Sequence, residues 1–177
     1  MDQQVLAAMA KWPDVPAVYG WLALDARGQW RLKGELLSQP AMTSFFGRNY
    51  QADAAGRWFV QNGPQRVYVA LEAAPLVLRR HPGAWQAAPT GASAKASAFF
   101  VTAGGEMYAA FAGVLALVDD RDLAGVLAEC LPDWDGELAT LPAELVCDGV
   151  AIALEPSCAA DLRARFGVCM TPTADAG

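Results

Sequence analysis

Apolar residues recur along this chain at two spacings, and the change from one spacing to the other predicts its elements. Between Val5 and Trp12 they lie three or four positions apart, which predicts an amphipathic helix over residues 2–12 that Pro13 ends. The same spacing predicts three more helices: one from Ser38 through Phe46, one opened by Asp119–Asp122, and one that carries Leu162 and Phe166 and stops at Gly167.

Between these helices, short apolar runs flanked by turn residues are typical of strands. Asp25-Ala26-Arg27-Gly28 and Asn62-Gly63-Pro64-Gln65 each separate two such runs. Asp148-Gly149 is the clearest hairpin signal, because Asp-Gly accepts the positive backbone torsions of a type I′ turn. The expected strands cover residues 21–24, 30–33, 58–60, 67–71, 76–78, 99–101, 107–111, 114–118, 145–147 and 150–152.

This order of elements predicts an α+β fold of antiparallel meanders and hairpins with about four helices. Three parts are expected: 1–80, a helix-hairpin-helix with a three-stranded meander; 81–96, a Pro/Gly/Ala-rich linker or surface loop; and 97–170, a meander with a second helix-hairpin-helix. One compact domain overall is the alternative. Because helix, hairpin and helix follow one another at 2–47 and again at 120–167, we hypothesise a pseudo-symmetric internal duplication.

Composition limits the class of protein. With 177 residues, 54% of them hydrophobic and 18% charged, the chain can bury a sizeable core and is not a disordered segment. The longest uncharged apolar run, 107–118, is too short to span a bilayer as a helix, so no membrane partner is expected. The N-terminal residues do not form a secretory signal, and a cytoplasmic location is therefore the expectation.

The residue types that usually carry chemistry give little support for catalysis. The four cysteines (Cys130, Cys147, Cys158 and Cys169) are too widely spaced for a paired zinc site, and we interpret them as reduced, small apolar residues. His81 is expected at the surface, and Asp119, Asp120 and Asp122 are expected to complement a helix N-terminus. No cofactor and no metal are predicted, and no catalytic residue can be named.

Charge is unevenly distributed. From Arg27 to Arg80 there are eight Lys or Arg and three acids, a charge of +5, while the whole chain carries −6 and the remainder therefore −11. The negative total makes nucleic acid an unlikely partner. A basic segment within an acidic chain instead indicates an anionic small molecule, an acidic protein surface or a second copy as partner.

The hairpin at residues 58–71 is the leading candidate for a binding site. If Val67 and Val69 face the core, alternation sends Arg66 and Tyr68 to the opposite face. Arg57, Phe59 and Gln61 on the neighbouring strand would join them, and guanidinium groups there could bind carboxylate or phosphate oxygens. The candidate ligand-binding residues are Arg48, Asn49, Tyr50, Arg57, Gln61, Arg66 and Tyr68.

Three interpretations of the basic segment stay open. Its polar residues can simply form a turn and a solvated strand face. The segment can dock on the acidic C-terminal half, which would neutralise it without a ligand. Otherwise it serves a non-enzymatic binding module, or alternatively a small enzyme or metabolite-binding protein that recognises an anion on this face. A pocket around these arginines would favour the enzyme, and a flat exposed sheet the module.

Several segments together resemble an uncharacterised family of bacterial proteins known only as a domain of unknown function. They are Val15-Pro16, 19–25, Arg48-Asn49-Tyr50, 56–59 and 61–68. The resemblance covers most of the chain and is most specific in its first 80 residues. It implies a stand-alone cytoplasmic protein, and it brings no activity, cofactor or catalytic residue.

Overall fold

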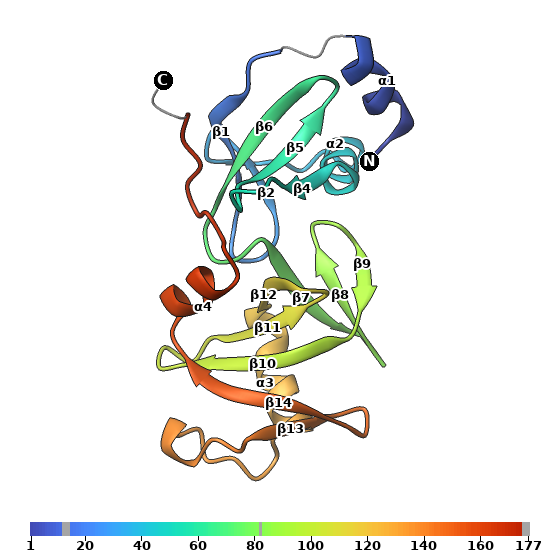
Figure 1. The fold of residues 1–177 in the computed structure, drawn as a ribbon. Coiled ribbons are helices and arrows are strands. Elements are labelled where there is room, and N and C mark those ends of the chain that lie inside the picture. Colours follow the sequence, from blue (N-terminus) through green and yellow to red (C-terminus); the bar gives the residue numbers. More distant parts are fainter. Residues whose placement is uncertain (12–14, 82, 175–177) are drawn as a thin grey trace.

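The computed structural model describes residues 1–11, 15–81 and 83–174, and Figure 1 shows them as two sheets placed end to end, each with its own helices. The first sheet has the strand order β3-β2-β1-β6-β5-β4, and the second has the order β13-β14-β10-β11-β12-β7-β8-β9. Most neighbours are antiparallel; β1/β6, β10/β14 and β7/β12 are parallel. The predicted α+β fold is confirmed.

The bounds of the elements follow chain order. The first sheet contains β1 (Val18–Leu24), β2 (Trp30–Leu32), β3 (Glu35–Leu36), β4 (Tyr50–Ala52), β5 (Trp58–Asn62) and β6 (Gln65–Leu71). The second contains β7 (Leu76–His81), β8 (Ala84–Ala88), β9 (Ala92–Ala94), β10 (Ala96–Thr102), β11 (Met107–Phe111), β12 (Val114–Val118), β13 (Glu144–Cys147) and β14 (Val150–Ser157). The helices are α1 (Gln3–Lys11), α2 (Pro40–Arg48), α3 (Asp120–Cys130) and α4 (Ala159–Arg165), with a short 3₁₀ turn at Leu138–Thr140.

Local turn chemistry explains why several elements end where the sequence predicts. One carboxylate oxygen of Asp25 accepts the backbone N–H groups of Arg27 and Gln29, which closes the β1–β2 turn. Asp148 and Gly149 have φ angles of 50° and 74°, as a type I′ turn requires. These hairpins are confirmed because the residues that determine each turn lie within four positions of one another.

The two sheets repeat one order of connections. In the first, the β1-β2-β3 meander leads through α2 and the additional edge strand β4 to the β5–β6 hairpin, whose last strand pairs in parallel with β1. In the second, the β10-β11-β12 meander leads through α3 to the β13–β14 hairpin, whose last strand pairs in parallel with β10. The repeated unit is thus meander, helix and hairpin, at 18–71 and 96–157, and differs from the helix-hairpin-helix repeat that the sequence suggested at 2–47 and 120–167.

The middle of the chain differs from the sequence-based prediction. Residues 76–78, expected to extend the 58–71 hairpin, belong to β7 and pair with β12 in the second sheet. Residues 81–96, expected to be a linker or surface loop, include β8, β9 and the first residue of β10. Trp85 and Ala87 face the core while Gln86 faces outward, but the many alanines hide this alternation in the sequence.

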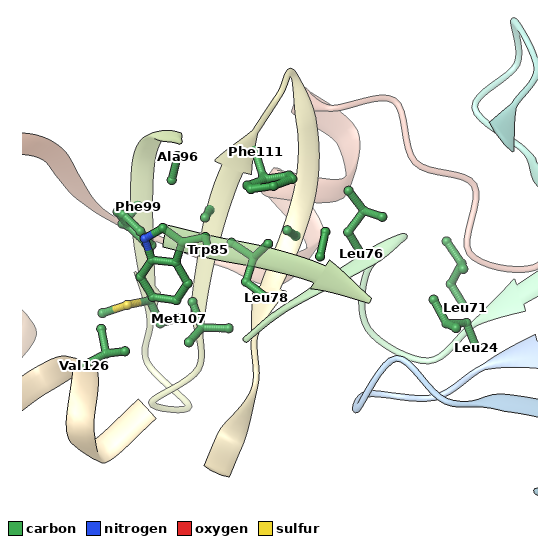
Figure 2. Close-up of a cluster of buried hydrophobic side chains, with 14 of the residues drawn as sticks. Leu24, Leu71, Leu76, Leu78, Trp85, Ala96, Phe99, Met107, Phe111 and Val126 are labelled. Atoms are coloured by element: carbon green, nitrogen blue, oxygen red, sulfur yellow. The ribbon is translucent and has the colours of Figure 1, made fainter. Parts of the chain in front are cut away.

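The main core runs through both sheets. Figure 2 shows Leu24 and Leu71 of the first sheet beside Leu76, which begins the second, and Trp85 packed near Phe99 deeper in the second sheet. Helix α3 contributes Val126 to this core. On the other face of the second sheet, Leu162 of α4 belongs to a smaller cluster with Phe100 and Tyr108. Helices therefore contribute to the hydrophobic clusters on both faces of the second sheet.

Cys130 and Cys147 form a disulfide that joins the end of α3 to β13, with their Cα atoms 5.2 Å apart. The prediction that all four cysteines are reduced was wrong for this pair, because the two residues meet only when α3 packs on the sheet. Cys158 and Cys169 are free thiols.

The C-terminal segment, residues 167–174, returns from α4 to the first sheet, as the red trace in Figure 1 shows. The backbone N–H of Cys169 donates to the carbonyl of Gly56, and the N–H of Leu71 donates to the carbonyl of Met170. Pro172 of this segment is buried. Within the described residues, no helix is both long and apolar enough to cross a membrane.

Candidate functional site

One face of the first sheet carries a row of cationic and aromatic side chains. Phe59 pairs with Tyr68, so both side chains point to one face of the sheet. Val69 pairs with Leu22 on the opposite face, and the residues before them, Tyr68 and Trp21, therefore lie on the same face as Phe59. The backbone N–H of Lys33 donates to the carbonyl of Trp21, which extends the row to the end of β2. The cation–aromatic face consists of Tyr19, Trp21, Lys33, Phe59, Arg66 and Tyr68.

The members of this face hold one another in place. Tyr19 stacks on Tyr68 with ring centroids 4.6 Å apart and an interplanar angle of 5°. The Arg66 guanidinium lies 4.9 Å from the centre of the Phe59 ring, and the Lys33 ammonium lies 3.9 Å from that of Trp21. Each cation–π contact contributes about 0.5–1 kcal/mol at an exposed site. The rings are therefore fixed, and the cations remain at the surface.

Exposure separates the face into a floor and a rim. Phe59 and Tyr68 are each only 3% exposed, because Tyr19 and the arginines cover them. Trp21 is 52% exposed, and Lys33 and Arg66 are also exposed. The predicted alternation of the hairpin is correct, but only Arg66 of its outward residues offers much surface to a partner.

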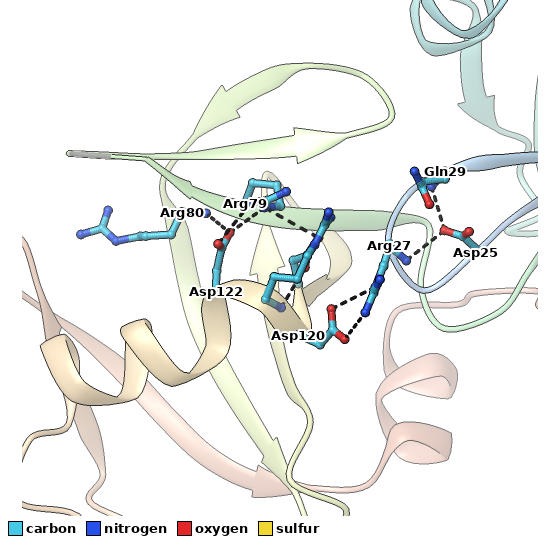
Figure 3. Close-up of polar contacts among 9 residues, drawn as sticks. Asp25, Arg27, Gln29, Arg79, Arg80, Asp120 and Asp122 are labelled. Atoms are coloured by element: carbon cyan, nitrogen blue, oxygen red, sulfur yellow. Dashed lines mark hydrogen bonds and ion pairs between the residues drawn. The ribbon is translucent and has the colours of Figure 1, made fainter. Parts of the chain in front are cut away.

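Three cations of the basic segment bind acids of the second half of the chain. Figure 3 shows Arg27 forming two hydrogen bonds with Asp120, and Arg79 binding Asp122, both in the first turn of α3. Arg80 donates to Glu129 and to Asp148 at 2.8 Å each. For these three arginines, docking on the acidic half is the interpretation that the contacts support.

Three other cations are paired with acids nearby in the first sheet or its helices. Arg31 pairs with Asp25 at 3.1 Å, Arg48 with Asp2 at 3.1 Å, and Arg57 with Asp53 at 2.8 Å. Lys33 and Arg66 are the remaining two, and neither has a carboxylate within 4.0 Å in the part of the chain that the structure describes. The two cations without such a partner both lie on the cation–aromatic face.

The Asp53 carboxylate ties Arg57 and Tyr68 into the floor of this face. Arg57 donates to it at 2.8 Å and the Tyr68 hydroxyl at 3.0 Å. Burial acts to raise the pKa of Asp53, but these hydrogen bonds and two backbone N–H groups hold it below its ordinary value. Burial raises the pKa of Tyr68, and the Asp53 carboxylate adds to that rise. Both side chains are thus held in the sheet by hydrogen bonds with Asp53.

Four of the seven residues predicted to bind a ligand lie elsewhere or are enclosed. Asn49 is 1% exposed; its side chain donates to the carbonyl of Phe45 and accepts the N–H of Asp2. Tyr50 pairs with Val60 and therefore points to the opposite face, where it is buried. The side chain of Gln61 is buried and donates to the Gly63 carbonyl. Arg48 is exposed and is bound to Asp2.

Arg57, Arg66 and Tyr68 do come together as predicted, and three residues that were not predicted lie with them: Tyr19, Trp21 and Lys33. Part of the signal was available, since the alternation that turns Leu22 and Leu24 inward turns Trp21 outward. Tyr19 could not be placed in this way, because the pairing of β1 with β6 shifts register between Val18 and Leu22.

The remaining candidates for chemistry are one exposed histidine and three acids with structural roles. His81 is exposed at the end of β7, as predicted. Asp119 caps α3 by accepting the N–H of Arg121, and Asp120 and Asp122 bind the arginines named above. Within the described part of the chain, no three or more His, Cys, Asp or Glu side chains gather as metal ligands would.

The fold and this face define a small α+β protein of two sheets with an open, partly aromatic surface on the first. The family model DUF2944, described as "Protein of unknown function (DUF2946)", matches residues 1–173, and the chain belongs to that family. The predicted membership of an uncharacterised family is confirmed. The family description assigns no activity, and no curated protein matches the sequence.

Two solved structures are similar in fold. A DUF1285 family protein from Silicibacter pomeroyi DSS-3 has a TM-score of 0.54 and 17% identity, over 87% of this chain and 95% of that one. A DUF1285 family protein from Shewanella baltica OS155 has a TM-score of 0.45 and 16% identity, over 60% of this chain and 90% of that one. At this identity the first likeness concerns the fold alone.

Proposed function

We propose that the protein is a non-enzymatic binding module whose cation–aromatic face takes an acidic surface of a partner protein. The observation that carries the proposal is the pairing of the basic segment. Six of its eight cations bind carboxylates of this chain, whereas Lys33 and Arg66 lie over aromatic rings and have no carboxylate within 4.0 Å among the described residues. A cation over a ring can still donate its N–H groups to a carboxylate.

A protein surface suits this face better than a small anion does. Trp21 is half exposed between the row of buried rings and Lys33, and exposed tryptophan is typical of protein interfaces. Arg66 lies on β6 and Lys33 follows β2, and β1, which carries Trp21, lies between these two strands. The cleft between the sheets includes Glu72 and Arg27 but not Arg48, Arg57 or Arg66, so the pocket that would favour an enzyme on this face is not formed there.

The test uses a fluorescein-labelled peptide of alternating glutamate and tyrosine, followed by fluorescence anisotropy. The double variant Lys33→Gln/Arg66→Gln should bind it about tenfold more weakly, since two exposed ion pairs of about 0.7 kcal/mol each would be lost. Its melting temperature should change little. Binding by the original protein should also weaken with added salt.

The matched control is Arg48→Gln/Arg165→Gln, which removes two exposed cations that already bind Asp2 and Glu155. This control should keep its affinity for the peptide. Equal loss of binding in both double variants would show that only net charge matters and would overturn the proposal. Displacement of the peptide by millimolar inorganic phosphate would identify a small-anion site instead.

A further inference from the structure

A cleft lies where the two sheets meet, apart from the cation–aromatic face. Its walls come from the β1–β2 turn, the chain between β6 and β7, the β10–β11 turn, and helices α3 and α4. Its volume is about 420 Å³, within the range of small-molecule sites. The polar side chains along it are Arg27, Glu72, Glu106, Tyr108, Asp120 and Arg163.

Tyr108 and Arg163 form the part of the cleft that suits an anionic group. Tyr108 is only 1% exposed, yet it lines the cleft. Burial and the nearby Glu106 raise its pKa, and the positive charge of Arg163, together with a hydrogen bond from it, opposes that rise. The Arg163 Nε also donates to the carbonyl of Ala73 at 3.4 Å, which orients the guanidinium. A neutral hydroxyl and an oriented guanidinium together can donate several hydrogen bonds to a carboxylate or phosphate.

Glu72 and Glu106 supply the opposite charge. One oxygen of Glu72 accepts the N–H of Ala26 at 3.1 Å, and one oxygen of Glu106 accepts the Thr102 hydroxyl at 2.6 Å. These bonds fix both carboxylates. The second oxygen of each has no hydrogen-bond partner among the described residues, so it is available to an ammonium group.

The remaining two charged residues neutralise each other. Arg27 and Asp120 form a pair of hydrogen bonds across the junction, at 3.2 and 2.9 Å, as Figure 3 shows. Apart from this pair, the charged side chains that line the cleft are Arg163, which can bind an anion, and Glu72 and Glu106, which can bind a cation. We propose that the cleft binds a small zwitterionic molecule, with its carboxylate or phosphate at Arg163 and Tyr108 and its ammonium at the two glutamates.

This site is independent of the proposed protein-binding face, because none of the residues that line the cleft belongs to the cation–aromatic face. The test measures the melting temperature with each of the twenty amino acids and with phosphoethanolamine, and with acetate and methylammonium as molecules of one charge. A zwitterion present at 100 times its dissociation constant should raise the melting temperature by roughly 5–10 °C. Acetate and methylammonium should raise it much less.

Matched variants locate the effect. Tyr108→Phe removes one hydroxyl and Arg163→Gln one cation, and each should weaken binding at least tenfold. Arg165→Gln removes a cation of the same helix that does not line the cleft, and it should bind normally. The proposal is overturned if no amino acid and no phosphoethanolamine raises the melting temperature, if the single charges act as strongly, or if both cleft variants still bind. Peptide binding by the cleft variants should be unchanged.

Discussion

The two sheets share one order of connections, but different contacts fasten them. The first sheet depends on distant parts of the chain: Cys169 and Met170 form backbone hydrogen bonds with Gly56 and Leu71, and the turn after β8 packs against α2. There a Cβ on Gly47 would lie 2.3 Å from the carbonyl oxygen of Pro89. The second sheet has β7, β8 and β9 in addition, and its own helix α3 is bound to it by a disulfide.

This difference explains where each sheet can bind a partner. Both faces of the second sheet bear hydrophobic clusters to which α3 and α4 contribute, and the proposed small-molecule cleft lies at its junction with the first sheet. The first sheet packs α2 on one side and leaves the rim of the cation–aromatic face open on the other. We expect the first sheet to open at lower free energy than the second, and hydrogen exchange can compare the amides of Val69 and Phe99.

The largest effect should follow from a methyl group between the C-terminal segment and the first sheet. Gly56 has a φ of 72°, and a Cβ there would lie 1.6 Å from the carbonyl oxygen of Gly167. Gly56→Ala should therefore lower the free energy of unfolding by about 4 kcal/mol, since backbone strain and a backbone clash add. Urea unfolding measures the loss, and hydrogen exchange should show it mainly in the first sheet.

The control for this change is Gly34→Ala. Gly34 also has a positive φ, 87°, but nothing lies within 4 Å of a Cβ placed there. Its cost should be the backbone contribution alone, about 1–2 kcal/mol. Equal losses of unfolding free energy in both variants would show that the C-terminal segment does not stabilise the first sheet.

The disulfide tests the second sheet in the same way. Cys130→Ala/Cys147→Ala should lower the free energy of unfolding by about 3 kcal/mol, the loop-closure value for a separation of this size. The loss should appear in α3 and β13 by hydrogen exchange. Cys158→Ala, which removes an exposed free thiol whose sulfur accepts the Asp161 N–H at 3.4 Å, should change stability by less than about 1 kcal/mol. A loss confined to the first sheet would contradict the assignment of the disulfide to the second.

The sequence allowed correct prediction where neighbouring residues decide the structure. Asp148 and Gly149 determine their own turn, and Asp119 caps the helix that it precedes. Prediction failed where distant segments decide it. Leu76–Leu78 were assigned to the wrong sheet because their partner is β12, about 40 residues further along the chain. The pairing of Cys130 with Cys147 likewise depends on how α3 packs.

The same distinction applies to the candidate site. Alternation placed Arg66 and Tyr68 on one face from the sequence of β6 alone. It could not show that Tyr19 of β1 covers Tyr68, or that Arg27 and Arg79 reach the acids of α3. Whether a cation is available to a partner depends on contacts with distant residues, and the sequence pattern does not contain them.

The smallest effect concerns the carboxylate at the start of α3. Arg121 hydrogen bonds, with a further contribution from Arg79, lower the pKa of the enclosed Asp119 from 3.8 to about 2, although burial opposes them. Because the folded pKa is lower than the unfolded one, the stabilisation, about 2 kcal/mol, is complete above pH 4. This stabilisation should disappear as the pH falls from about 4 to about 2.

The difference in unfolding free energy between the original protein and Asp119→Asn should shrink over that range, since asparagine keeps the cap but does not titrate. A difference that stays constant from pH 7 to pH 2 would show that Asp119 acts on α3 only as a cap.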